Sequence, residues 1–415
     1  MTKFAKMSLV TAIAVTGMAS SLVAAETLSE AFSNGKLKGS LKSYYFAQDV
    51  DNETAANKDS SIWANGGHLN FVTDSYKGFV LGTTFQHSSV GHLDDKGTSS
   101  KTAGSMDAQG SVLSELYLQY TVNNTTFKGG RQFITTPLLA GSGSRLIKEA
   151  FEAYLGINTD LPDTTIVAGI VTKYQTRTDK STYSDNTAAV DFQSNGTGEP
   201  GNFNDIKNDG LKTLYLKNTS IDGLTVQGQY AQVNDVLSAI YADAKYSFGG
   251  DLKPYVATQY YDTDYDAVTG LKDNSLYGLK AGINVSGVDL FAGYTSNGNS
   301  SVNGDARTFR GIGQGAYAHY TATTKTAGNN AFIAGTDAWQ VGAGYKFDAL
   351  KTKLRYTSFD DPSANADLDE TTLNLEYKFS GKFKNLKAQI DYSILDYENN
   401  TRDATDLRTR LIYSF

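Results

Sequence analysis

The chain has 415 residues, with 37 basic and 44 acidic side chains, 26 Tyr, 20 Phe, 40 Gly, 5 Pro and no cysteine. The acidic balance argues against nucleic acid as a partner, because phosphates need a basic surface, and the missing cysteines exclude disulfide bridges and thiolate metal sites. Abundant aromatic residues and glycines favour strands joined by turns.

The N-terminal residues 1–25 have the three-part pattern of a secretory signal peptide. Two lysines precede an apolar run over residues 7–18, and a Val-Ala-Ala cleavage site closes the segment. The apolar run is too short for a membrane helix, which needs roughly 20 residues. We expect cleavage after Ala25, then a short N-terminal segment over residues 26–36 and a single domain over residues 37–415.

Apolar and polar residues alternate through this domain in segments of about ten residues, the length of a tilted strand that crosses a bilayer. In the last segment, 407–415, Leu, Thr, Leu, Tyr and Phe alternate with Arg408, Arg410, Ile and Ser. Aromatic residues recur near segment ends, as in the girdles of membrane barrels. The opposite face carries charges or glycine, which a packed sandwich core would not accept. The pattern predicts an all-β fold, a single closed antiparallel transmembrane β-barrel.

The connections between segments alternate between short and long. Eight short turns and nine long links predict eighteen strands, with sixteen as the alternative because the segments around 163–174 and 211–217 have weak registers. The short turns are expected at the periplasmic rim and the long loops on the extracellular side. A barrel of sixteen to eighteen strands encloses an aqueous lumen, so this size favours a channel.

The inward face of the first strand and the last strands is basic. Among the inward positions of these strands, Glu376 and Asp391 are the acids, whereas most Asp residues fall in the long links. A basic wall would focus the field in the lumen and favour small anions, although solvated charges without such a role are the alternative. The predicted pore-lining residues are Arg408, Arg410, Lys353, Arg355, Lys387, Lys346 and Lys42.

The third long link, Ile134–Leu146, is apolar and rich in small residues. On the surface it would form an exposed apolar patch, so we expect it to fold into the lumen and narrow the pore. Packing on the outer rim is the alternative. The predicted constriction residues are Arg131, Arg145, Lys148 and Ser144.

Three stretches of the chain resemble the OprD-type porin family, which comprises eighteen-stranded outer-membrane channels for small, often carboxylate-bearing substrates. They are Leu28–Gly35 leading into Gly39–Phe46, then Ser144–Phe151, and finally Arg408–Phe415. The resemblance implies that Arg408 and Arg410 belong to the family's basic ladder and that the terminal Phe415 serves barrel assembly. After Ser-Arg-Leu, where the family commonly has Pro and Thr, this chain has Lys148 and Ala150.

These features predict a porin, integral to the bacterial outer membrane, that passes small hydrophilic solutes and favours anionic or carboxylate-bearing ones. Expected partners are outer-membrane lipid, lipopolysaccharide and, through Phe415, the barrel-assembly machinery; the protein is a monomer or a trimer. No cofactor or metal is expected. An outer-membrane hydrolase and a surface adhesin or structural protein are the alternative functions. His87 and His92 near Asp94 and Asp95 are the one candidate metal cluster that a hydrolase could use.

Overall fold

The computed structural model describes residues 25–54, 58–95, 106–180, 188–192, 196–298, 307–316, 319–325, 329–362, 367–398 and 402–415. The expected signal peptide lies outside these ranges except for Ala25. No helix in the described ranges is long and apolar enough to cross a membrane.

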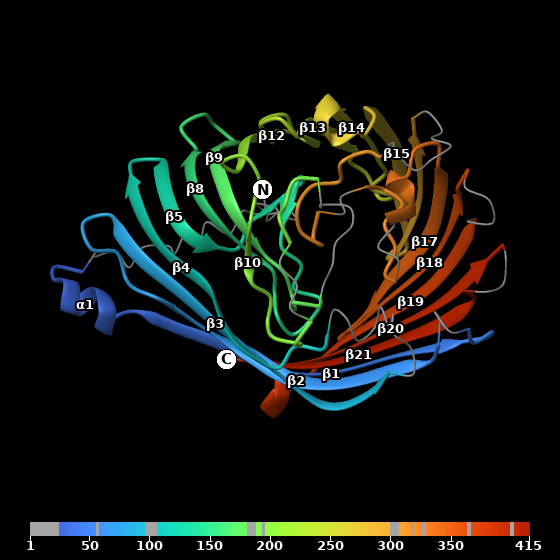
Figure 1. Ribbon diagram of the computed structural model, residues 1–415, viewed down its shortest axis with the longest axis horizontal. Helices are drawn as coiled ribbons and strands as arrows, with labels where there is room; N and C mark the ends of the chain where they lie inside the picture. The colour runs from blue at the N-terminus through green and yellow to red at the C-terminus, as the bar shows by residue number, and fades with distance from the viewer. Residues whose placement is uncertain are drawn as a thin grey trace.

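Eighteen antiparallel strands form a closed barrel (Figure 1), which confirms the larger of the two predicted strand counts. The barrel strands are β1 (Lys36–Val50), β2 (Ser60–Val72), β3 (Phe79–Asp95), β4 (Gly110–Val122), β5 (Thr125–Gln132), β8 (Ala150–Asn158), β9 (Thr164–Gln175), β11 (Leu211–Asn218), β12 (Leu224–Val233), β13 (Leu237–Ser247), β14 (Tyr255–Tyr265), β15 (Asn274–Val285), β16 (Val288–Asn297), β17 (Asp337–Phe347), β18 (Leu350–Asp360), β19 (Leu368–Lys378), β20 (Leu386–Tyr397) and β21 (Ala404–Ser414). Pairing of β1 with β21 closes the ring. A short extra strand, β10 (Phe203–Asp205), pairs with the end of β9.

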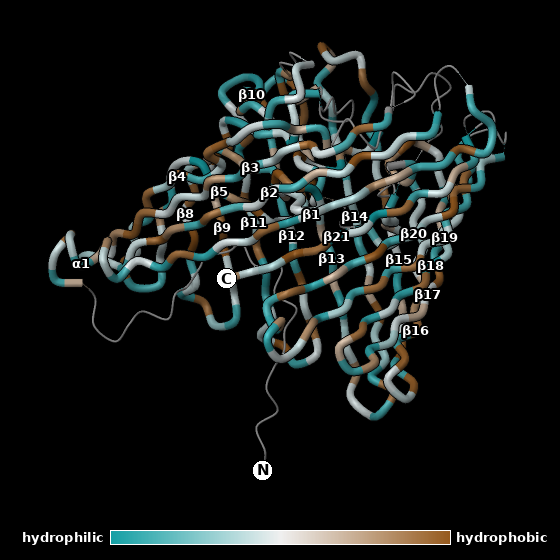
Figure 2. Tube along the Cα trace, turned by 90° about the horizontal axis from the view of Figure 1, so that it is seen from below, coloured by the Kyte–Doolittle hydropathy of each residue, from teal (hydrophilic) through white to brown (hydrophobic). Residues whose placement is uncertain are grey.

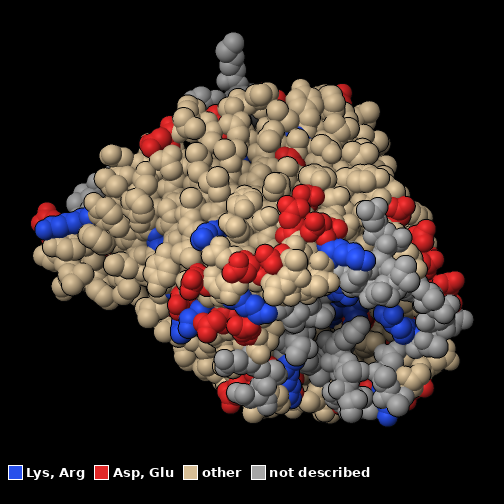
Figure 3. All heavy atoms as spheres, turned by 45° about the horizontal axis from the view of Figure 1, so that its top comes forward, with Lys and Arg blue, Asp and Glu red and all other residues tan. Residues whose placement is uncertain are grey.

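Side chains alternate between the lumen and the outer surface along each strand. In β21, Arg408 and Arg410 face inward and are 5% and 8% exposed, whereas Leu411 and Tyr413 face outward and are 44% and 41% exposed. Figure 2 shows hydrophobic and hydrophilic residues alternating along the strands. In Figure 3 the charged side chains gather at the loop end, while the barrel wall above carries few. This distribution suits a wall surrounded by lipid.

Short turns join the strands at one rim, and long loops join them at the other, as the sequence predicts. In the turn between β15 and β16, Ser286 and Gly287 have φ values of 51° and 87°. Two-residue hairpin loops need such left-handed backbone, which explains the glycine here.

In the part of the chain that the structure describes, four short helices lie outside the strands of the wall: α1 (Leu28–Ser33), η2 (Ala267–Thr269), η3 (Asn329–Phe332) and η4 (Gly381–Phe383). Helix α1 begins with a capping box, in which the Thr27 side chain accepts from the Glu30 N–H and the Glu30 carboxylate accepts from the Thr27 N–H. Its Ala31 carbonyl accepts from the Asp74 N–H in the first short turn, at 2.9 Å. These contacts fix the N-terminal segment against the rim with the short turns.

The third loop, residues 133–149, folds into the lumen and contains the small hairpin β6 (Thr135–Thr136) and β7 (Leu139–Ala140). The Leu138 N–H donates to Gln229 Oε1 on β12 at 2.7 Å, and Lys42 Nζ on β1 donates to the Leu146 carbonyl at 3.3 Å. Strands β12 and β1 lie on opposite sides of the barrel (Figure 1), so the loop reaches across the lumen. This placement agrees with the prediction.

The seventh loop joins β16 to β17, and its described residues 307–316, 319–325 and 329–336 also enter the lumen, a placement that the sequence did not predict. Its Ile312 forms a parallel bridge with Leu139 of the third loop. The Ile312 N–H donates to the Leu138 carbonyl at 2.9 Å, and the Ile312 carbonyl accepts from the Ala140 N–H at 3.1 Å. The pore is therefore narrowed by two loops that are hydrogen-bonded to each other.

Candidate functional site

Three arginines converge on Ser144 of the third loop. Arg145 and Arg177 donate to the Ser144 hydroxyl at 3.1 and 3.3 Å, and Arg410 Nε donates to the Ser144 carbonyl at 3.4 Å. Arg145 lies in the third loop, Arg177 lies two residues after the end of β9, and Arg410 lies on β21. Together with Arg408, we call these residues the arginine cluster.

Phe46, on the inner face of β1 and 1% exposed, is surrounded by three guanidinium groups of this cluster. Arg145, Arg410 and Arg408 lie 4.8, 4.9 and 5.4 Å from the centre of its ring. An aromatic face attracts cations without carrying a charge that would cancel theirs. The ring therefore holds the guanidinium groups together and leaves their charge available.

Carboxylates compensate part of this charge. Glu149 lies 3.5 Å from Arg177, Asp391 lies 2.5 Å from Arg410, and Asp406 lies 2.7 Å from Arg408. Burial lowers the pKa of Arg145 well below its ordinary value; the charges of Arg408, Arg177 and Arg410 lower it further, and Asp406 opposes them. The surroundings of Arg145 thus disfavour its positive charge, and a nearby anion would stabilise the charged form.

Residues 319–325 of the seventh loop, which we call the strap, lie along the inner wall. The Ala322 carbonyl accepts from Arg355 at 2.8 Å, and the Thr324 carbonyl accepts from Arg408 at 2.9 Å. Lys325 bonds Asp406 at 2.5 Å and Gln48 Oε1 at 3.0 Å. Arg355 and Arg408 therefore hold a loop in place, in addition to any contact with solutes.

Burial lowers the pKa of Lys325 to about 8, and the neighbouring charge of Arg408 lowers it as well. The carboxylate of Asp406 has the opposite effect but does not outweigh burial. The ammonium group lies in the lumen among side chains of β1 and β21. The strap thus brings a further cation to the arginine cluster.

A chain of hydrogen bonds links the inward arginines across four neighbouring strands. Arg355 on β18 donates to Asn374 Oδ1 on β19 at 2.9 Å. Asn374 Nδ2 donates to Asp391 on β20 at 2.7 Å, and Asp391 pairs with Arg410 on β21. Because each side chain is held by the next, the basic wall is fixed in position.

The predicted pore-lining lysines differ in their partners. Lys42 bonds the third loop, and Lys353 lies 4.9 Å from the centre of the Phe291 ring. Lys387 is 3.4 Å from Glu376, which compensates its charge. Lys346 is exposed beside the short turn between β17 and β18. Of these four lysines, Lys42 is the one shown to contact the third loop.

Lys148, a predicted constriction residue, is held by both its backbone and its side chain. Its N–H donates to Gln86 Oε1 at 2.9 Å, and Gln86 Nε2 donates to its carbonyl at 2.8 Å. The ammonium lies 4.0 Å from the centre of the Phe133 ring. Burial lowers the pKa of Lys148, against the opposing effect of Glu115. This end of the third loop is thereby fixed to β3.

Arg131, the other predicted constriction residue, does not join the cluster, and this prediction needs correction. It lies opposite Leu116 in the register of β4 and β5, and Leu116 is exposed on the outer face. Its side chain pairs with Glu152 at 3.7 Å and stacks on Phe203 at 4.1 Å. Strand alternation directs this residue outward although it is close to the third loop in sequence.

Arg177, Lys325 and Glu149 belong to the constriction but were absent from the sequence prediction. Arg177 and Lys325 lie in long links that were expected on the extracellular side, away from the constriction. One signal for the seventh loop was available: Gly311, Gly313 and Gly315 alternate with larger residues within it, a small-residue pattern similar to that of the third loop.

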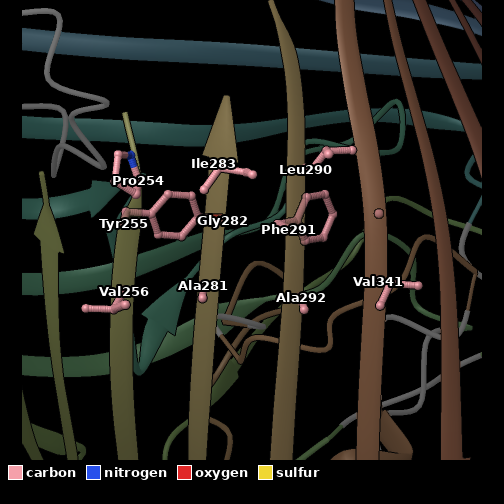
Figure 4. Close-up of a pocket in the computed structure, with 11 residues that line it drawn as sticks. Pro254, Tyr255, Val256, Ala281, Gly282, Ile283, Leu290, Phe291, Ala292 and Val341 are labelled. Atoms are coloured by element: carbon pink, nitrogen blue, oxygen red, sulfur yellow. The ribbon is translucent and has the colours of Figure 1, made fainter. Parts of the chain in front are cut away.

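Neither a metal site nor the groove across β14–β17 adds a solute site among the described residues. No group of three or more His, Asp or Glu side chains in these ranges could hold a metal, and His87 bonds the Ser111 hydroxyl at 2.8 Å. A groove across β14–β17 (Figure 4) is apolar. Because Val256, Leu290 and Val341 on its surface are exposed outward, the groove faces the lipid side of the wall.

Comparisons with known proteins identify the family. The model of the OprD family, described as outer membrane porins, matches residues 30–415. Comparison with curated proteins finds no similar sequence.

Solved structures share the fold at low sequence identity. Pseudomonas aeruginosa OccK9 (OpdG) is 17% identical with a TM-score of 0.75, covering 93% of this chain and 99% of its own. Acinetobacter baumannii OccAB2 is 18% identical with a TM-score of 0.73, with the same coverage of 93% and 99%. Acinetobacter baumannii OccAB1 is 14% identical with a TM-score of 0.73, with coverage of 95% and 99%. A closed barrel narrowed by inserted loops and a family match over nearly the whole chain lead to one conclusion: the chain belongs to the OprD family of outer-membrane porins, which are channels for small solutes.

Proposed function

We propose that this porin favours anionic solutes, including carboxylate-bearing ones, and that they pass the constriction beside Arg145, Arg177 and Arg410. The observation that carries the proposal is the convergence of these three guanidinium groups on Ser144. A guanidinium presents parallel N–H donors that match the two oxygens of a carboxylate. A solute carboxylate would also relieve the repulsion among the arginines.

The lysines on the pore wall support a path toward this cluster. Lys42 lies against a loop carbonyl, and Lys353 and Lys148 lie against aromatic rings, so these partners leave their charges uncancelled. Lysines at the edge of a low-dielectric wall raise the local concentration of anions. We propose that these lysines attract anions into the pore and that the arginine cluster selects among the anions.

The proposal predicts a measurable anion preference that depends on Arg410. In planar bilayers under a salt gradient, the reversal potential of the native channel is expected to indicate anion preference. Arg410→Gln removes a cation and leaves Asp391 without this partner, so the permeability ratio should fall toward one. Arg131→Gln is the matched control, because Arg131 faces outward, and should leave the ratio unchanged. A cation preference in the native channel, or equal effects of both variants, would contradict the proposal.

We also propose that the barrel-assembly machinery recognises Phe415, as the resemblance to the family implies. The Phe415 backbone pairs with Gly39 of β1 at 2.9 and 3.0 Å. Its ring lies where a side chain on Gly39 would be, only 2.6 Å from an added Cβ. This residue therefore also closes the seam between the first and last strands.

Phe415→Ala is expected to lower the amount of assembled porin severalfold, because both recognition and seam packing lose the ring. The measurement is the fraction of heat-modifiable protein in isolated outer membranes. Leu407→Ala, which shortens an outward side chain in the first half of β21, serves as the control. Equal amounts of assembled Phe415→Ala and control protein would refute this role.

A further inference from the structure

Glu149, at the end of the third loop, is a fully buried carboxylate, 0% exposed. Its Oε2 accepts from the Ser142 N–H at 2.9 Å and from the Gln314 N–H at 2.8 Å. Its Oε1 lies 3.5 Å from Arg177 Nε. One side chain thus contacts both inserted loops and the segment that follows β9.

We propose that Glu149 is a positioning residue that sets the size limit of the channel by holding the third loop, the seventh loop and Arg177 in one arrangement. The inference deepens the proposed function, since it concerns the same constriction. It rests on the channel activity and does not depend on the preference for anions.

The contacts of Glu149 explain why a carboxylate is needed at this position. Both oxygens face donors: Oε2 accepts from two backbone N–H groups, and Oε1 lies beside a guanidinium. A neutral amide of the same size would direct its own N–H donors at one of these groups. Buried polar groups without a partner are strongly disfavoured, so the amide would disrupt the contacts that join the two loops and Arg177.

The two loops also approach each other closely beside Glu149. The Gly315 N–H donates to the Ala140 carbonyl at 2.8 Å, next to the pairing of Ile312 with Leu138 and Ala140. These backbone bonds join the two loops to each other. Glu149 also joins both loops to the barrel wall, because its own backbone continues into β8, which begins at Ala150. Loss of the carboxylate should therefore leave the loops paired with each other but less firmly placed in the lumen.

The test compares Glu149→Gln with Glu152→Gln in proteoliposomes of the full-length porin. Glu152 lies three residues further along the chain and pairs with Arg131 on the outward face, so it is the matched control. Swelling rates are measured with a series of neutral sugars of increasing size. We expect Glu149→Gln to raise the relative rate of the larger sugars severalfold and Glu152→Gln to leave the series unchanged.

The reversal potential separates this role from a purely electrostatic one. If Glu149 contributes only charge, Glu149→Gln increases anion preference and leaves the sugar series unchanged, and the inference is overturned. If the anion proposal fails but the sugar series shifts, the inference stands by itself. Heat-modifiable migration verifies that each variant is folded.

Discussion

Replacing Leu354 by arginine is expected to destabilise the folded barrel in lipid by about 2–4 kcal/mol, the cost of a cation on the lipid face near the membrane midplane. Leu354 lies in the middle of β18, faces outward and is 52% exposed. A guanidinium there would enter a medium that supplies no hydrogen-bond partners. The free energy of unfolding can be measured by urea titration in lipid vesicles, with the fluorescence of Trp63 and Trp339 as the signal.

The neighbouring Lys353 provides the matched control, because it lies one residue away and faces the lumen. Lys353→Arg keeps the charge in a solvated channel and should change the free energy of unfolding by much less than Leu354→Arg. Equal losses of stability in the two variants would mean that the assignment of the two faces is wrong.

The barrel itself was predictable because one rule acts at every strand. Lipid on one side and water on the other impose a period of two, and a slip by one residue would turn Arg408 and Arg410 into the membrane. The strands with weak registers, β9 and β11, nevertheless pair with each other from Leu211 to Asn218. The neighbouring strands of the closed barrel fix the registers of these two strands. This is a tertiary effect, which the local sequence pattern does not contain.

The same alternation decides which strand side chains near the site face the lumen. It places Arg355 and Arg410 on the inner wall, where their contacts lie. Arg131 was assigned to the constriction from its distance along the chain to the third loop, although alternation directs it outward. An irregularity in the pairing of β3 with β4, between Thr84 and Phe85, lies close to this region and obscures the register locally.

The role of the seventh loop was beyond prediction from local sequence. Lys325 and Arg177 reach the arginine cluster only because two long loops dock inside the lumen, through contacts between residues far apart in the chain. Lys325 meets Asp406 on the last strand and Gln48 on the first. From composition alone, charged residues in long loops are expected to be solvated at the surface.

The seventh loop can dock only because glycines allow its backbone to approach the third loop. Gly313 has a φ of 95°, and an added Cβ would lie 2.2 Å from the Ala140 carbonyl oxygen. Gly311 has a φ of 106°, with the Leu138 carbonyl oxygen 2.4 Å from such a Cβ. At both positions a side chain would meet backbone atoms, which have little freedom to move aside.

Gly313→Ala is therefore expected to release the seventh loop from the third and to widen the channel. Strain at a left-handed position costs about 1–3 kcal/mol before the clash is counted. An energy of that size shifts an equilibrium between docked and released loops by about 5- to 150-fold. Single-channel recordings should show a larger conductance with frequent transitions between levels, while the barrel remains folded because its strands are unchanged.

Gly270→Ala separates the effect of close approach from that of backbone strain. Gly270 has a φ of 67° in the sixth loop, and no atom lies within 4 Å of an added Cβ. This variant introduces the strain without the collision and outside the lumen contacts, so its conductance should match that of the native channel. An unchanged conductance in Gly313→Ala would show that the docked seventh loop does not limit the flow of ions, and the constriction would then depend on the third loop alone.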